Sequence, residues 1–245
     1  VGVDNTAVAG WDPNHYLFQA KASLAKYRYD LGIVFLFVGN DIVRNKRAGL
    51  LPREPESHQH WRIPHAFTRK EIIDALLYPF NELMERTSHL YVFIKNASQS
   101  LLARVGLTAY YFPEIFLKAE ADSPRWTITA EICADIKSEF GKFATPVVFV
   151  LLPESSQVHR EFFDRYVQWF GIDPATVDLD QPNRLLAGEF AKSDLRLIDV
   201  LPELRRGAKA GSRMYGWIDD HFNRNGHRAV AEAIQPVVKE LVAHL

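Results

Sequence analysis

The most informative segment of the chain is LGIVFLFVGND, residues 31–41, in which a long apolar run passes directly into Gly39, Asn40 and Asp41. A run that is apolar on both faces is typical of a central strand in a parallel sheet that is covered by helices. Ligands of such sheets bind at the carboxyl ends of the strands. The polar residues that follow this strand are therefore candidates for function, although Gly, Asn and Asp also favour ordinary turns.

Other segments alternate between strand and helix patterns. Residues 145–153 and 195–202 are apolar runs that predict strands, and residues 1–5 are a further candidate strand. Apolar residues recur at helical spacing over 15–30, and 182–193 is also helical in pattern. This alternation predicts an α/β fold with a doubly wound parallel sheet.

We expect residues 1–245 to form a single domain, with 42–125 as an insertion that a simple crossover between strands does not require. The first part of the insertion is rich in Pro, His and charged residues, and the second part is mostly helical in pattern. A further helix is expected within 123–141, with Thr127 or Thr129 as its N-cap.

Composition excludes several classes of protein. The chain is 47% hydrophobic and 24% charged over 245 residues, enough for a substantial core. Its net charge of -1 provides no global field for nucleic acid or an anionic membrane, so we expect no nucleic-acid partner. Cys133 is the only cysteine, which rules out an intrachain disulfide. No apolar run reaches the ~20 residues that span a bilayer.

A second polar motif lies near the C-terminus, in the sequence DDHFNRNGH. Asp219 and His221 precede Asn223, which is a plausible N-cap for a long amphipathic helix that starts near Gly226 and His227. A carboxylate beside a histidine can hold one ring nitrogen, fix the tautomer and stabilise the imidazolium. The motif therefore suggests a general base, with an ordinary loop histidine as the alternative.

These motifs resemble those of the SGNH or GDSL hydrolases. The family carries a nucleophilic Ser in a Gly-Asp-Ser turn, then a Gly, an Asn in a Gly-x-Asn-Asp turn, and an Asp and a His near the C-terminus. Gly10, Asn40, Asp219 and His221 match the last four elements. The resemblance covers about 1–41 and 126–245, and implies a flavodoxin-like hydrolase fold.

The resemblance also implies a role for each matched residue. The backbone N–H of Gly10 and the side-chain NH₂ of Asn40 would donate hydrogen bonds to the oxyanion formed when an ester carbonyl is attacked. His221 would act as the base, oriented by Asp219. The Asp-x-His spacing looks closer to the alginate O-acetyltransferase-like branch than to many lipases, and it makes Asp220 the less favoured acid.

No Gly-Asp-Ser turn occurs in the chain, and residues 1–9 are too few to hold the strand, helix and second strand that should lie before Gly10. We therefore expect the nucleophilic Ser on a missing N-terminal segment upstream of Val1. The expected function is an ester hydrolase or O-acyltransferase of the Ser-His-Asp type, acting on a small-molecule or glycan ester and needing no metal or organic cofactor. Relatives with this C-terminal pattern are often exported or membrane-tethered.

Three alternatives remain open at this point. A non-catalytic glycan-binding or scaffold protein would retain the fold and lack the Ser. A metal-dependent hydrolase would need ligands from one of two sets: His58, His60 and His65, or Asp219, Asp220, His221 and His227. A serine elsewhere in the chain is a weaker nucleophile candidate for want of glycines around it: Ser98, Ser100, Ser155 or Ser156.

Overall fold

The computed structural model describes residues 2–8, 10–43, 112–216 and 221–243, together with a few isolated positions between 84 and 94. Its sheet contains β1 (Gly32–Phe37), β2 (Val147–Leu152) and β3 (Leu197–Asp199), all parallel and in the order β1-β2-β3. The prediction of an α/β fold with a parallel sheet is confirmed. Across the described ranges, no helix combines the length and the apolar character needed to cross a bilayer.

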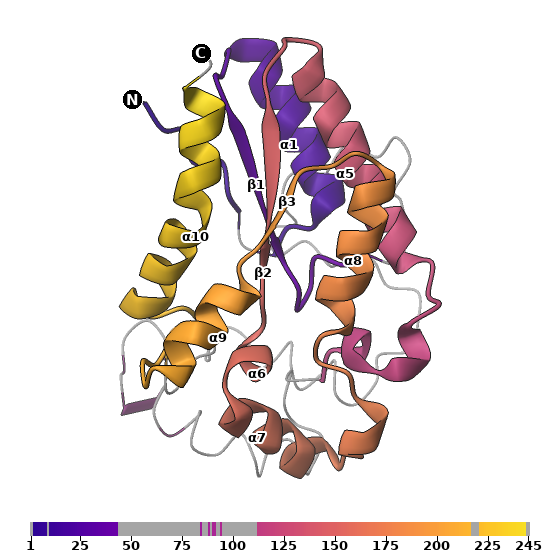
Figure 1. The fold of residues 1–245 in the computed structure, drawn as a ribbon, viewed down its shortest axis with the longest axis vertical. Helices are drawn as coiled ribbons and strands as arrows, with labels where there is room; N and C mark the ends of the chain where they lie inside the picture. The colour runs from indigo at the N-terminus through magenta and orange to yellow at the C-terminus, as the bar shows by residue number, and fades with distance from the viewer. Residues whose placement is uncertain are drawn as a thin grey trace.

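Helices cover both faces of this sheet (Figure 1). On one face lie α1 (Pro13–Lys26), α5 (Arg125–Gly141) and α8 (Gln181–Lys192). On the other lie α9 (Leu201–Lys209) and α10 (Arg224–Val242). Shorter elements complete the described chain: α6 (Ser155–Val158), α7 (Arg160–Phe170) and the 3₁₀ helices η1 (Glu114–Phe116), η2 (Lys118–Glu120) and η3 (Pro174–Thr176).

The central strand β2 is buried on both faces because its side chains alternate between two cores. Phe149 and Leu151 pack into the larger core, with Leu36 of β1 and the helices α1, α5 and α8. Val150 packs into the smaller core, with α9 and α10. An apolar run without alternation is the expected sequence signature of such a strand.

One side of β1 is open in the described part of the chain. Ile33 and Phe35 are 36% and 42% exposed, whereas Leu36 is buried in the larger core. The N–H groups of Gly32 and Val38 point toward β2. They donate to Pro146 O and Leu152 O, respectively, each at 2.9 Å. Backbone groups alternate in direction along a strand, so those of Ile33 and Phe35 face the outer edge.

Several predicted boundaries are wrong. Residues 2–8 lie outside every helix and strand, so the candidate strand over 1–5 does not form within them. The helix predicted over 15–30 begins earlier, at Pro13, because Asp12 caps it, and ends at Lys26 before the extended residue Tyr27. The strand predicted over 195–202 is shorter, since α9 already begins at Leu201.

Neither Thr127 nor Thr129 is an N-cap, because α5 begins at Arg125 after Pro124. The hydroxyl oxygen of Thr129 instead accepts a hydrogen bond from the backbone N–H of Val43 at 3.1 Å, inside the core. Most of the expected insertion, 42–125, lies outside the described residues. Its last part is structural, since Ile115 and Phe116 are buried in the larger core.

Candidate functional site

The carboxyl ends of the parallel strands meet at one edge of the sheet, and α1, α6 and α9 begin there (Figure 1). Three of the four residues predicted from the sequence are described, and all belong to segments at this edge. Gly10 precedes α1, Asn40 follows β1, and His221 precedes α10. The fourth, Asp219, lies outside the described residues.

A tight turn after β1 holds Asn40 at the surface. The N–H groups of Asn40 and Asp41 both donate to Phe37 O, at 3.3 and 2.9 Å. The buried carboxylate of Asp41 accepts the Phe37 N–H at 2.7 Å, which closes the turn from the other direction. The side chain of Asn40 is exposed beyond this closed turn, where it can meet a ligand.

Tyr16 of α1 connects this turn to the segment that contains Gly10. Its hydroxyl lies 2.9 Å from Oδ2 of Asp41 and 3.1 Å from Trp11 O. Burial raises the pKa of Asp41 to about 6, although the hydrogen bonds from Phe37 and Tyr16 oppose this rise. Burial and the nearby Asp41 carboxylate also raise the pKa of Tyr16, so its hydroxyl stays protonated.

Gly10 has a conformational reason to be glycine. Its φ of +78° lies in the left-handed region that side chains disfavour, and an added Cβ would meet nothing within 4 Å. The constraint is therefore the backbone conformation and not a lack of space. Next to it, the Asp12 carboxylate accepts from the N–H groups of Asn14 and His15 and fixes the start of α1.

His221 belongs to a short antiparallel pairing between the chain after α9 and the chain before α10. Tyr215 and Phe222 form a β-bridge, and the Gly216 N–H donates to His221 O at 2.9 Å. The Tyr215 hydroxyl donates to Pro153 O at 2.8 Å, directly after β2. We call residues 213–216 and 221–223 the His221 hairpin. The imidazole of His221 is exposed on it.

The predicted N-cap, Asn223, is confirmed, and it does more than cap. Its side-chain oxygen accepts the N–H groups of Asn225 and Gly226, at 2.8 and 3.2 Å. Its NH₂ group donates to Arg213 O and Tyr215 O, at 2.9 and 3.1 Å. A Cβ on Gly226 would press against Met214 O. The Asn-x-x-Gly spacing thus docks α10 onto the His221 hairpin.

His159, which directly precedes α7, anchors the hairpin, and no sequence motif predicted this role. Its Nε2 accepts the Met214 N–H at 3.0 Å, and its Nδ1 is 4.0 Å from the Glu161 carboxylate. Burial lowers the pKa of His159, Arg213 also lowers it, and Glu161 acts in the opposite direction. His159 is separated from Met214 by 55 residues, so no local sequence pattern predicts the contact.

The serines after β2 are poor nucleophiles in this fold. Ser155 and Ser156 are buried, and both hydroxyls donate to the carboxylate of Glu154. Glu154 also accepts the Tyr166 hydroxyl at 2.8 Å and the Ser156 N–H at 2.8 Å. A buried carboxylate needs such donors. The arrangement is that of a structural capping network at the start of α6, which agrees with the low ranking of these serines as nucleophiles.

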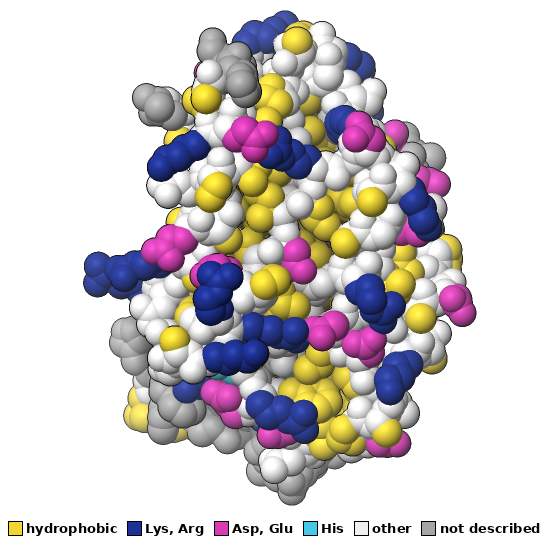
Figure 2. Space-filling view, in the orientation of Figure 1, with side chains coloured by type: hydrophobic (Ala, Val, Ile, Leu, Met, Phe, Trp, Pro, Cys, Tyr) yellow, Lys and Arg dark blue, Asp and Glu magenta, His cyan; other side chains and the backbone are white. Residues whose placement is uncertain are grey.

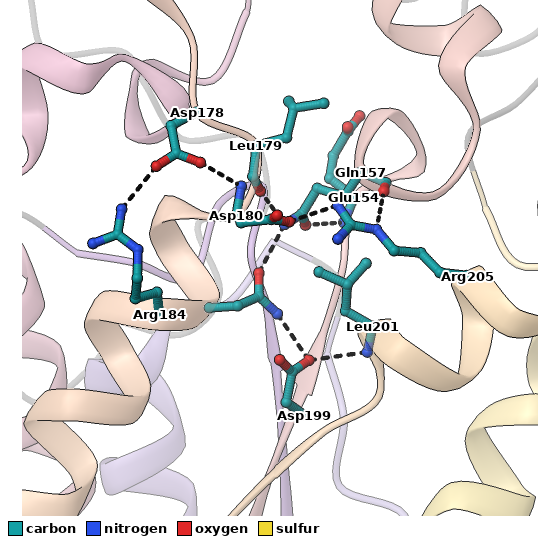
Figure 3. Close-up of polar contacts among 10 residues, drawn as sticks. Glu154, Gln157, Asp178, Leu179, Asp180, Arg184, Asp199, Leu201 and Arg205 are labelled. Carbon is teal, nitrogen blue, oxygen red and sulfur yellow. Dashed lines mark hydrogen bonds and ion pairs between the residues drawn. The ribbon is translucent and has the colours of Figure 1, made fainter.

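A separate cleft of about 650 Å³ lies beside the carboxyl end of β3, between α8 and α9. Asp199 accepts there from the side chain of Asn183 and from the Leu201 N–H, at 2.8 and 2.9 Å (Figure 3). Arg205 donates to Gln157 O at 2.7 Å and pairs with Asp180 at 2.6 Å. Burial raises the pKa of Asp199. These contacts join α6, α8, β3 and α9 at one point.

The surface around this cleft carries many Lys and Arg side chains, with Asp and Glu among them (Figure 2). Arg184 pairs with Asp178 at 2.7 Å, and Arg206 pairs with Glu203 at 2.7 Å. Such exposed pairs each contribute ~0–1 kcal/mol to stability. Because the guanidinium groups have carboxylate partners on the protein, the cleft has a mixed charge.

Among the described residues, no group of three or more His, Cys, Asp or Glu side chains could hold an ion, and most residues of the two metal alternatives are not among those described. Some of the candidate residues lie outside them: His58, His60, His65, Ser98, Ser100, Asp219 and Asp220. His227, at the start of α10, has its ring 5.9 Å from that of Phe222.

Comparison with known proteins gives no family for this chain: no family model matches it, and neither does any curated protein or solved structure.

Proposed function

We propose that this chain is part of a serine-dependent ester hydrolase or O-acyltransferase with an SGNH-type, flavodoxin-like fold. The observation that carries the proposal is the shared edge of the sheet: Gly10, Asn40 and His221 come from distant segments and all lie at its carboxyl end. Glycan esters are the favoured substrates because the Asp-x-His spacing resembles that of O-acetyltransferase-like proteins.

In the proposed reaction, His221 removes the proton from a serine hydroxyl as the serine oxygen attacks the ester carbonyl. The carbonyl oxygen becomes negative, and the Gly10 N–H and the Asn40 NH₂ donate to it. Collapse of this intermediate expels the alcohol, which takes the proton from His221 and leaves an acyl-serine. Water or an acceptor hydroxyl then removes the acyl group by the same steps. Asp219 holds His221 in the required tautomer.

The open side of β1 is where the proposed segment that carries the serine would pack. Within the described residues, no strand pairs with the outer edge of β1, and Ile33 and Phe35 expose apolar area on the same strand. In the proposed whole protein, a segment upstream of Val1 adds a parallel strand at this edge and a helix over Ile33 and Phe35. The turn after that strand, Gly-Asp-Ser, would then stand beside the turn of Asn40.

A hydrolysis assay with the full-length gene product tests this function. We expect release of 4-nitrophenol from 4-nitrophenyl acetate, and of acetate from an O-acetylated polysaccharide. His221→Ala should lower both rates by ~10³-fold or more, because the serine loses its base. His227→Ala is the matched control, since it removes a nearby exposed histidine that has no proposed role.

Equal rates in the two variants would contradict the role of His221. No hydrolysis or acyl transfer by the unsubstituted full-length protein, together with retained glycan binding, would favour the non-catalytic binding protein instead.

A further inference from the structure

We propose that Tyr16 is a positioning residue that fixes the distance between the Gly10 segment and the turn of Asn40. This inference rests on the proposed function, in which those residues supply the two oxyanion donors. Tyr16 itself touches no reacting atom in the proposal. It acts through the residues on either side of its hydroxyl.

The hydroxyl of Tyr16 lies between two neighbours of the proposed donors. It is 3.1 Å from the carbonyl oxygen of Trp11, which follows Gly10. It is also 2.9 Å from the carboxylate of Asp41, which follows Asn40. A change of about 1 Å in the separation of two such donors is enough to weaken transition-state stabilisation strongly.

Both ends of this link are held by other contacts. The Tyr16 backbone N–H donates to Asp12 O at 3.1 Å in the first turn of α1, and its ring packs against the larger core. Asp41 is 3% exposed, and its carboxylate is fixed by the Phe37 N–H at 2.7 Å. A hydroxyl bound in this way transmits the position of α1 to the β1 turn.

The hydroxyl can donate only one hydrogen bond. When Asp41 is ionised, the carboxylate is the stronger acceptor and takes this hydrogen. Asp12 at the cap of α1 and the buried thiol of Cys133 on α5 are the other titratable groups that influence this pair. Loss of the hydrogen bond to Asp41 should therefore have a larger effect than loss of the contact with Trp11 O.

Tyr16→Phe tests the link, because it removes the hydroxyl and keeps the ring that packs in the core. Tyr29→Phe is the matched control, since the Tyr29 hydroxyl also donates to an aspartate, Asp4, at 2.6 Å, but at an exposed site. In the 245-residue chain, we expect Tyr16→Phe to raise the pKa of Asp41 further, because a donor to the ionised form is lost. A carboxyl-carbon NMR titration measures this.

The same variant should speed amide hydrogen exchange at Trp11 and Asn40, whereas Tyr29→Phe should leave both amides and the pKa of Asp41 unchanged. In the full-length protein, Tyr16→Phe should lower kcat by ~10-fold to ~100-fold at nearly constant KM, as misplacement of donors predicts.

Two results would overturn the positioning role alone. The first is a Tyr16→Phe chain whose amide hydrogen exchange at Trp11 and Asn40, and whose pKa of Asp41, match those of the unsubstituted chain. The second is an unchanged kcat for Tyr16→Phe in a full-length protein that is active. Failure of the proposed function is a different observation, namely an unsubstituted full-length protein that turns over no ester. That result would contradict both the serine chemistry and the catalytic part of this inference.

Discussion

The Nε2 atom of His159 accepts a hydrogen bond from the Met214 N–H at 3.0 Å, so one imidazole joins the start of α7 to the His221 hairpin. A nitrogen that accepts cannot carry a proton, and the contact therefore requires the neutral ring. Protonation of Nε2 would bring its N–H group against the Met214 N–H, and the hydrogen bond would be lost. The position of His221 is in this way coupled to the titration of a second histidine.

We expect His159 to make stability depend on pH. Its pKa is lowered in the folded chain, so its stabilising contribution is complete above its unfolded pKa, about 6.5, and is lost as pH falls through the folded pKa. His159→Gln replaces the ring by an amide that can still accept but does not titrate in this range. The free energy of unfolding of this variant should fall less between pH 6.5 and the acid range, about pH 5, than that of the unsubstituted chain.

Chemical denaturation at several pH values measures the difference between the two proteins. Because the other histidines are common to both, only the difference reports on His159. Parallel curves for the variant and the unsubstituted chain would remove His159 from the pH response.

Asp41 should make stability depend on pH in the opposite direction to His159. Burial raises its folded pKa to about 6, so its contribution is most favourable below its ordinary pKa and is lost as pH rises through about 6. Asp41→Asn keeps an oxygen that can accept from Phe37 and Tyr16 but carries no charge. We expect this variant to be more stable than the unsubstituted chain at pH 7, by ~1–3 kcal/mol, and to lose that advantage near pH 4.

Thermal and urea unfolding of Asp41→Asn at the two pH values checks this expectation. A variant that is less stable at pH 7 would mean that the carboxylate makes hydrogen bonds that the amide cannot replace.

Gly226 should be required for docking α10 onto the His221 hairpin. Gly226→Ala places a Cβ against Met214 O, a backbone atom that cannot move aside easily, and should cost ~1–3 kcal/mol of unfolding free energy. Gly188→Ala is the control within α8, where an added Cβ meets nothing within 4 Å. It should be neutral or stabilising by up to ~1 kcal/mol, because alanine favours the helix. Similar costs at both positions would refute the docking role.

Asn40 should affect catalysis without supporting the fold. In the full-length protein, Asn40→Ala should lower kcat by ~10²-fold to ~10³-fold, as loss of one oxyanion donor does, with little change in unfolding free energy. Asn40→Asp is the isosteric comparison, because it replaces the donor NH₂ by an acceptor and should be no more active. Steady-state kinetics with an activated acetyl ester measures both. An unchanged kcat in Asn40→Ala would exclude it from the mechanism.

Local patterns predicted the elements that depend on local physics. The apolar run of β2, the helical spacing of α8, and the capping of α10 by Asn223 all require only neighbours in sequence, and all occur as expected. The short strand β3 and the helix α9 were misjudged together, because LRLIDVLPE is apolar enough for a longer strand while Pro202 fits the first turn of a helix.

The internal architecture of the site could not be predicted in the same way. Tyr16 meets Asp41 across 25 residues, and His159 meets Met214 across 55. Such contacts arise from the order of the strands, which places distant turns at one edge of the sheet. An isolated tyrosine on a helix or a histidine between two helices has no sequence signature that distinguishes it from a core or surface residue.

The most direct test of the proposed serine chemistry is covalent labelling of the full-length gene product with a fluorophosphonate, followed by peptide mapping. We predict a single labelled serine, in a Gly-Asp-Ser turn upstream of Val1. Labelling should persist in His227→Ala and disappear in His221→Ala, because only the second variant removes the proposed base. No labelling, or labelling of Ser98, Ser100, Ser155 or Ser156, would contradict the proposal.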